Sequence, residues 1–290
     1  MILGDEPRDV NLRETSSILR HIELMQDPEG ATFPADNVHN PQYRTVVANR
    51  HSSMFHAYRL NPLMSEAAVE CIGTFLFALT VPLCLKYNPE MACIGIGFFF
   101  ASLVFSFAYI SGGHFNPIVA TSMWLSMPPG ERHNAFGGSR LVLYVLAQMV
   151  GGSLGTLCYV VLEGADSTLP NIEEGLPQLM RGFLAECIFM FLLCSAVLHT
   201  ADRKLLSRAH FHGLAVGFTL VCSGLTCGPI PRGALNPTVG TPLFVLHLIL
   251  GEGSVLKGGA GVFLDWVAGV VGAAAASFLY LTTQNAEEED

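Results

Sequence analysis

Two Asn-Pro pairs carry the residues of this 290-residue chain whose types and spacing suggest chemistry: Asn116-Pro117 and Asn236-Pro237. Asparagine is a favoured N-cap and proline fits the first turn of a helix, so each pair predicts a helix start. A helix start carries partial positive charge and unpaired N–H groups. Each pair therefore offers hydrogen-bond donors to a neutral solute with acceptor atoms, and raises the potential against cations and protons.

The composition of the chain indicates an integral membrane protein. Hydrophobic residues make up 51% of the chain, charged residues only 13%, and the mean hydropathy is +0.44. A soluble domain carries about 25% charged residues, so a soluble enzyme is disfavoured. The net charge of −9 and the lack of a basic stripe in the sequence argue against nucleic acid as a partner.

Six apolar windows without Lys or Arg predict membrane-spanning helices, because a crossing needs roughly 20 apolar residues. The windows run approximately over Leu63–Leu85, Met91–Ile110, Leu141–Leu162, Gly182–Thr200, Gly213–Cys227 and Gly259–Thr283. Two shorter apolar stretches, Phe115–Met127 and Leu235–Leu250, follow the second and fifth windows. They are too short to span, so each predicts a re-entrant segment, with an apolar loop as the alternative.

An internal repeat relates the two halves of the sequence. The pattern Glu-Cys-Ile-x-x-Phe-Leu occurs at 70–76 and again at 186–192, and the two Asn-Pro pairs lie 120 residues apart. Ala, Gly and Tyr residues of the third window recur 121 residues later in the sixth. Because each copy holds three spans, the second copy is inverted in the membrane. An inverted repeat predicts a site at the midplane, where the two half-helix starts face each other.

The positions of the basic residues predict that both termini lie in the cytosol. Eleven of the 15 Lys and Arg residues fall on the side that holds the termini, as the excess of positive charge in cytoplasmic loops requires. The eight cysteines lie in or beside apolar windows without a Cys-x-x-Cys pair. They fit helix packing and neither disulfides nor a metal site.

Over residues 62–283 the sequence resembles the aquaporin, or major intrinsic protein, family. The run ISGGHFNPI at 110–118 is similar to the first signature of that family, and GALNPT at 233–238 to the second. Gln148 matches a recurrent glutamine of the third helix, and TADR at 200–203 matches the usual end of the fourth.

The resemblance implies an all-α membrane protein with an aquaporin-like inverted repeat, six transmembrane helices plus two re-entrant half-helices. Repeat one would cover about 62–162 and repeat two about 179–283, between a cytoplasmic tail (1–61) and an acidic C-terminal tail (284–290). It also implies a homotetramer in the lipid bilayer and passive transport of water and small neutral solutes, with no enzyme activity, cofactor or metal. A plasma membrane and an intracellular organelle membrane both remain open.

Glu70 and Glu186 stand where the family places glutamates that support the re-entrant loops. Physics agrees, because a carboxylate at membrane depth needs buried donors and loop backbone at that depth supplies them. His114, within the first signature, is expected to fix its loop. Glu66 fits a helix-end glutamate that reaches the interface.

Both signatures depart from the family's Asn-Pro-Ala. The pore signature residues implied by the resemblance are Asn116, Pro117, Ile118, Asn236, Pro237 and Thr238. Isoleucine is bulkier than alanine, so Ile118 predicts that the narrowing at the junction is lost or reshaped.

The selectivity filter implied by the resemblance falls, by spacing, at Ile96, Gly224, Gly233 and Val239. Most family members carry an arginine where Val239 stands, so an apolar and wider constriction is expected here, without that donor and cation barrier. Arg232 could swing in as a replacement, although a solvated loop arginine is the simpler reading.

Branch signatures are mixed. Gly240 replaces the aspartate that is usual in glycerol-conducting members. Trp266 stands in the aromatic pair of water-selective members, beside Asp265, and Gly269 replaces a usual proline. Three functions stay open: a water channel with some solute leakage; a wide-pore facilitator for glycerol, urea, ammonia or peroxide; and a non-conducting structural or regulatory membrane protein.

Overall fold

The computed structural model describes residues 61–127, 136–164, 176–201, 211–228, 235–250 and 255–287. These residues belong to one compact unit, Leu60–Asp290. The predicted N-terminal tail lies outside the described residues except for Asn61. The last helix continues to Glu287, into the stretch expected as a C-terminal tail.

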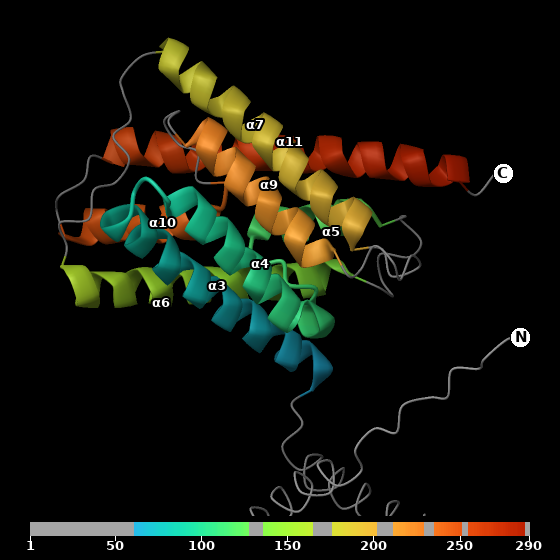
Figure 1. Ribbon diagram of the computed structural model, residues 1–290, viewed down its shortest axis with the longest axis horizontal. Coiled ribbons are helices and arrows are strands. Elements are labelled where there is room, and N and C mark those ends of the chain that lie inside the picture. Colours follow the sequence, from blue (N-terminus) through green and yellow to red (C-terminus); the bar gives the residue numbers. More distant parts are fainter. Residues whose placement is uncertain are drawn as a thin grey trace, which may run out of the picture. The chain divides into compact units, whose positions relative to one another are not determined.

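Each regular element of the described residues is a helix (Figure 1). The helices are α3 (Pro62–Tyr87), α4 (Ala92–Ser111), α5 (Pro117–Leu125), α6 (Gly138–Glu163), α7 (Leu176–Thr200), α9 (His212–Cys227), α10 (Pro237–Leu250) and α11 (Val255–Glu287). The short helices α5 and α10 start at the two Asn-Pro pairs, as the sequence predicts.

Five of the described helices, α3, α4, α6, α7 and α11, are long and apolar enough to cross a membrane. The helix that matches the fifth window, α9, has 16 residues. At 1.5 Å per residue it covers about 24 Å, which is less than the roughly 30 Å of a bilayer's hydrocarbon core. The helix matches the predicted window Gly213–Cys227 to within one residue and, like that window, is shorter than a full crossing.

The packing of the helices repeats the symmetry of the sequence. Helix α3 packs against α6 and α4 in the first repeat, as α7 packs against α11 and α9 in the second. The half-helices exchange partners between the repeats, because α5 packs against α11 and α10 against α6. Helices α4 and α9 pack against each other between the repeats. In Figure 1, α10 lies on the left and α5 on the right. The two half-helices thus sit in equivalent places of an inverted repeat.

Glycines allow the long helices to approach closely. A Cβ added to Gly151 of α6 would lie 2.1 Å from the Cys71 carbonyl oxygen of α3. At the equivalent place in the second repeat, a Cβ on Gly272 would lie 2.6 Å from the Cys187 carbonyl oxygen. Small residues serve this purpose in membrane helices, where backbone contact replaces the hydrophobic drive of water.

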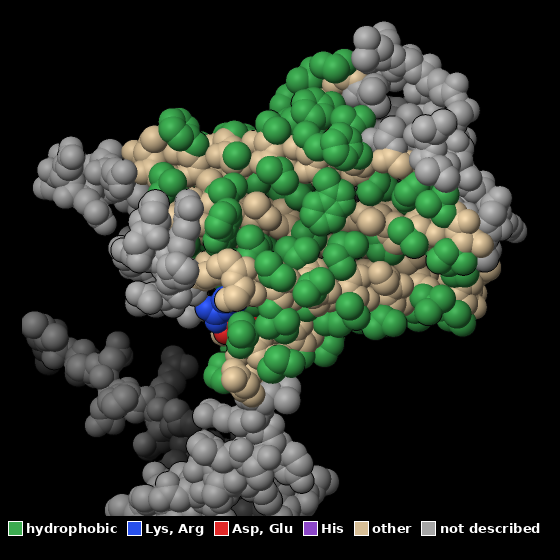
Figure 2. Space-filling model, turned by 180° about the vertical axis from the view of Figure 1, so that it is seen from behind, with side chains coloured by type: hydrophobic (Ala, Val, Ile, Leu, Met, Phe, Trp, Pro, Cys, Tyr) green, Lys and Arg blue, Asp and Glu red, His purple; other side chains and the backbone are tan. Residues whose placement is uncertain are grey.

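The outer surface of the described helices is strongly apolar. Figure 2 shows hydrophobic side chains over most of the described area on that face, with charged groups gathered at one spot. Tyr109 and Phe278 are each more than 70% exposed. Exposed apolar side chains are unfavourable in water and favourable in contact with lipid, so this surface is typical of a membrane protein.

Candidate functional site

The residues directly before the two asparagines have matching backbone conformations. Phe115 and Leu235, each one residue before an asparagine, have positive φ angles of 46° and 49°. Bulky residues adopt this left-handed conformation only where their surroundings hold them in it. The Phe115 ring is fully buried, and a Cβ on Gly73 of α3 would lie 2.1 Å from it. Packing therefore fixes a strained turn at the first loop.

Each asparagine caps its own helix and binds the other loop. Asn116 Oδ1 accepts a hydrogen bond from Ile118 N at 2.9 Å, and Asn236 Oδ1 accepts one from Thr238 N at 3.1 Å. Across the repeats, Asn116 Nδ2 donates to the Leu235 carbonyl at 2.7 Å, and Asn236 Nδ2 donates to the Phe115 carbonyl at 2.9 Å. The two bonds join residues 119 and 121 positions apart. This pair of exchanged bonds, called here the asparagine junction, places both helix starts side by side.

Glu70 ties the first loop to α3. Its Oε1 accepts bonds from the Ser111 hydroxyl at 2.6 Å and His114 N at 3.0 Å. Its Oε2 accepts bonds from Phe115 N at 2.7 Å and Gln148 Nε2 at 2.8 Å. The carboxyl group is fully buried. Four donors offset the cost of placing a carboxyl group there.

Glu186 lies in the equivalent place of the second repeat. It is 2% exposed, and its Oε1 accepts a bond from Leu235 N at 3.3 Å. Phe115 and Leu235 correspond in the two repeats, so both glutamates bind the left-handed residue of their loop. Gly233 and Arg232 lie outside the described residues.

Sequence reasoning missed a polar cluster beside the first loop. Glu66, expected at the interface, is only 8% exposed and is paired with Arg140 of α6, whose Nε donates at 2.7 Å. The Tyr144 hydroxyl lies 2.7 Å from the Ser111 carbonyl oxygen and 3.1 Å from Glu66 Oε2. One sequence signal was present: Arg140, Tyr144 and Gln148 are four residues apart and therefore share one helix face.

His114 holds its loop through the backbone. Its N–H binds Glu70, while its ring packs against Phe136 and Tyr144 with centroids 5.4 Å away in each case. Its Nδ1 is buried without a hydrogen-bond partner among the described residues. The imidazole therefore contributes packing to the loop.

The third residue of each signature is fully buried. Ile118 belongs to the hydrophobic core and faces Gly269 of α11. The Thr238 hydroxyl donates to Asn236 Oδ1 at 2.8 Å, which adds a bond that the first signature lacks.

A model of the major intrinsic protein family matches residues 57–280. The chain belongs to this family. Nodulin-26 of Glycine max is 28% identical over 233 residues, which cover 76% of this chain and 78% of the relative. A probable NIP-type aquaporin of Nicotiana alata is 27% identical and covers 88% of this chain and 89% of its own. Members of the family are passive channels and not enzymes.

The fold agrees with a solved structure of the family. The X-ray structure of the aquaglyceroporin from Plasmodium falciparum aligns with a TM-score of 0.62 and 24% sequence identity, over 75% of this chain and 95% of that one. The all-α, aquaporin-like membrane fold expected from the sequence is thereby confirmed.

The predicted filter positions that lie within the described residues differ in their surroundings. Ile96 is half-buried against the core, and Val239 is 8% exposed within it. A Cβ on Gly224, by contrast, would lie 2.9 Å from Cys93 Sγ of α4. Leu220, one helical turn before Gly224, packs on the same core as Ile96 and Val239. The number of residues between α9 and Asn236 does not determine which of these two turns, that of Leu220 or that of Gly224, faces the predicted filter.

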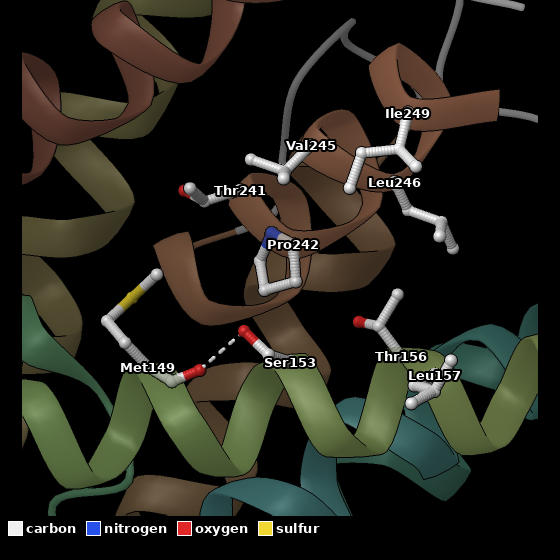
Figure 3. Close-up of a pocket in the computed structure, with 9 residues that line it drawn as sticks. All are labelled: Met149, Ser153, Thr156, Leu157, Thr241, Pro242, Val245, Leu246 and Ile249. Carbon is white, nitrogen blue, oxygen red and sulfur yellow. Dashed lines mark hydrogen bonds between the residues drawn. The ribbon is translucent and has the colours of Figure 1, made fainter. Parts of the chain in front are cut away.

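A separate groove of about 200 Å³ lies between α6 and α10 (Figure 3). It is lined by Met149, Ser153, Thr156, Leu157, Thr241, Pro242, Val245, Leu246 and Ile249. The Ser153 hydroxyl in this lining donates to the Met149 carbonyl at 2.8 Å. Its lining is mainly apolar and includes neither asparagine, so the groove is distinct from the asparagine junction of this channel protein.

Proposed function

We propose that this protein is a passive channel for water, with some passage of small neutral solutes, which move past the asparagine junction. The observation that supports the proposal is that each asparagine amide donates to a carbonyl of the opposite loop, Asn116 to Leu235 and Asn236 to Phe115. An amide group has two N–H donors, and each asparagine uses one of them to bind the opposite loop. The second N–H of each amide then donates to the oxygen of a passing solute.

The proposed junction also opposes cations. Two helix starts that face each other bring their partial positive charges to one place. A water molecule accepts two hydrogen bonds there, whereas a cation meets only positive ends. Rigid placement of the asparagines supports this role, since both are at least 96% buried and cap their own helices.

A wider solute range is a second candidate function. Valine at 239, in place of the family's arginine, supplies neither a donor nor a charge, and Ile96 and Leu220 would keep the filter apolar. This composition supports facilitated passage of glycerol, urea, ammonia or peroxide, while Gly240 argues against a glycerol-specific channel. A homotetramer with both termini in the cytosol, in a plasma or organelle membrane, completes the proposal.

Stopped-flow light scattering on purified protein in liposomes tests the main proposal. An impermeant osmolyte gradient should give fast shrinking, and Asn116→Asp or Asn236→Asp should reduce it to the rate of empty liposomes, because a carboxylate has no N–H to donate. Asn61→Asp is the matched control, since Asn61 also caps a helix before a proline and is exposed. Aspartate is an equally good N-cap there. Wild-type rates equal to empty liposomes would contradict conduction.

Replacing Val239 with Arg tests the filter. Glycerol or urea gradients should give slower reswelling in Val239→Arg than in wild type, with water flux retained. Equal solute flux in wild type and Val239→Arg would show that residue 239 does not line the path.

A further inference from the structure

We propose that Gly269 is a positioning residue for the first signature, because it makes room for Ile118, a third residue that is larger than alanine. The inference rests on the proposed function and explains how the first signature keeps its geometry without Asn-Pro-Ala. Gly269 belongs to α11, the long helix of the second repeat against which the half-helix α5 of the first repeat packs.

The side chain of Ile118 occupies the space in front of Gly269. A Cβ added to Gly269 would lie 2.8 Å from Ile118 Cγ1, 3.0 Å from Cδ1 and 3.3 Å from Cγ2. Ile118 has no exposed surface. Its bulk is therefore directed into the contact between α5 and α11, while its effect on the narrowing at the junction stays a prediction.

Ile118 has little freedom to yield to a larger neighbour. A β-branched side chain is stiff at χ1, and a close-packed core leaves no alternative rotamer site. Its N–H binds Asn116 Oδ1, and Asn116 Nδ2 in turn binds the Leu235 carbonyl. A displacement of Ile118 would thus pass through two hydrogen bonds to the centre of the junction.

The second signature meets a glycine in a different way. A Cβ on Gly152 of α6 would lie 2.5 Å from the Thr238 carbonyl oxygen and 2.9 Å from Thr238 Cβ. Pro242, four residues after Thr238, has no N–H to donate to that carbonyl. An alanine at position 238 would present the same carbonyl and Cβ, so Gly152 lets α6 approach the backbone of α10 and serves as a comparison for Gly269.

The two glycines are not copies of one repeated residue. At the repeat offset of 121 residues, Gly152 corresponds to Ala273 and Gly269 corresponds to Gln148. Gly269 is therefore not part of the repeated glycine pattern that Gly151 and Gly272 form.

Water and glycerol permeability of proteoliposomes tests the inference. Gly269→Ala should lower water permeability at least about fivefold, because overpacking displaces the first turn of α5. The double variant Ile118→Ala/Gly269→Ala should return to within about twofold of wild type, since the two changes compensate at one contact. Ile118→Ala alone should retain flux and lower the Tm.

Two control variants carry the same glycine-to-alanine change. Gly272→Ala meets the α7 backbone, and Gly152→Ala meets mainly the Thr238 carbonyl. Ile118→Ala should rescue neither of them. Unchanged flux in Gly269→Ala, or equal rescue of Gly272→Ala, would overturn the inference.

A second readout separates this inference from the proposed function. If wild type does not conduct, the channel proposal fails, and the pairing is then judged from Tm values in detergent. Positive coupling between Ile118→Ala and Gly269→Ala, with none between Ile118→Ala and Gly272→Ala, supports the pairing. Additive Tm changes for both pairs would contradict it.

Discussion

At the asparagine junction, the described residues of the two loops share the left-handed turn before the asparagine and differ in the contacts described around it. Both have a left-handed residue, an asparagine cap and a glutamate behind them. The first loop is also surrounded by Arg140, Tyr144 and Gln148. The repeat offset places Gly261, Asp265 and Gly269 at the corresponding positions of the second repeat.

The comparison distinguishes the features that the junction requires from those found beside one loop. The left-handed residue, the asparagine cap and the glutamate are present twice, and they direct each asparagine amide at the opposite loop. The ion pair of Glu66 with Arg140 and the Tyr144 hydroxyl contact are described beside the first loop, where they are one solution to holding a loop at membrane depth. Changes to the cluster should therefore act on stability more than on the geometry of the second loop.

The largest effect should come from Glu70→Gln, compared with Glu186→Gln. The new amide NH₂ cannot accept the hydrogen bonds that the carboxylate accepts, so buried donors would be left unsatisfied. We expect this to lower the free energy of unfolding by about 2–5 kcal/mol. Glu186→Gln should cost less, since Glu186 lies 3.3 Å from Leu235 N where Glu70 lies 2.7 Å from Phe115 N. Thermal unfolding in detergent, followed with a thiol-reactive dye, measures both. Equal losses would show that the two loops are supported alike.

An intermediate effect is expected for Arg140→Gln. The change leaves the mostly buried Glu66 carboxylate without its cation. Because Arg140 is 32% exposed, we expect the free energy of unfolding to fall by about 1–3 kcal/mol. Lys86→Gln is the control, since Lys86 pairs with Glu163 at the other end of the same two helices and is 44% exposed. That control should leave the Tm unchanged. A similar fall of the Tm in both variants would show that burial does not determine how much these ion pairs contribute to stability.

The smallest effect is expected for Tyr144→Phe, which keeps the aromatic packing on His114 and removes the hydroxyl. The Ser111 carbonyl then loses its contact with the hydroxyl, which should lower the free energy of unfolding by about 1 kcal/mol. The Tm should fall slightly while water permeability stays at the wild-type value. A loss of permeability as large as that of Asn116→Asp would place Tyr144 in the conduction machinery.

Local signals in the sequence were sufficient for the elements of the fold. Asn-Pro pairs specify helix starts through short-range capping, and the apolar windows locate the long helices within a few residues. The repeat then indicates which elements are equivalent. These features depend on neighbours in sequence, so one chain is enough to find them.

Features that depend on the direction of a side chain in the packed structure were not predictable. Glu66 and Arg140 lie 74 residues apart and meet only because α3 and α6 pack side by side. Whether Ile118 points into a pore or into α11 follows from the rotation of α5, which its apolar sequence does not determine. The closeness of Gly224 to Cys93 likewise follows from the packing of α9 on α4.

The exchange of bonds across the junction has a consequence for biosynthesis. While the ribosome has made only the first repeat, the Asn116 amide has no Leu235 carbonyl to bind, because its partner is 119 residues further along the chain. The left-handed turn at Phe115 must then be held by Glu70 and the polar cluster alone. The contacts that hold the first loop are therefore needed first, because the first repeat is in the membrane before the second repeat has been translated.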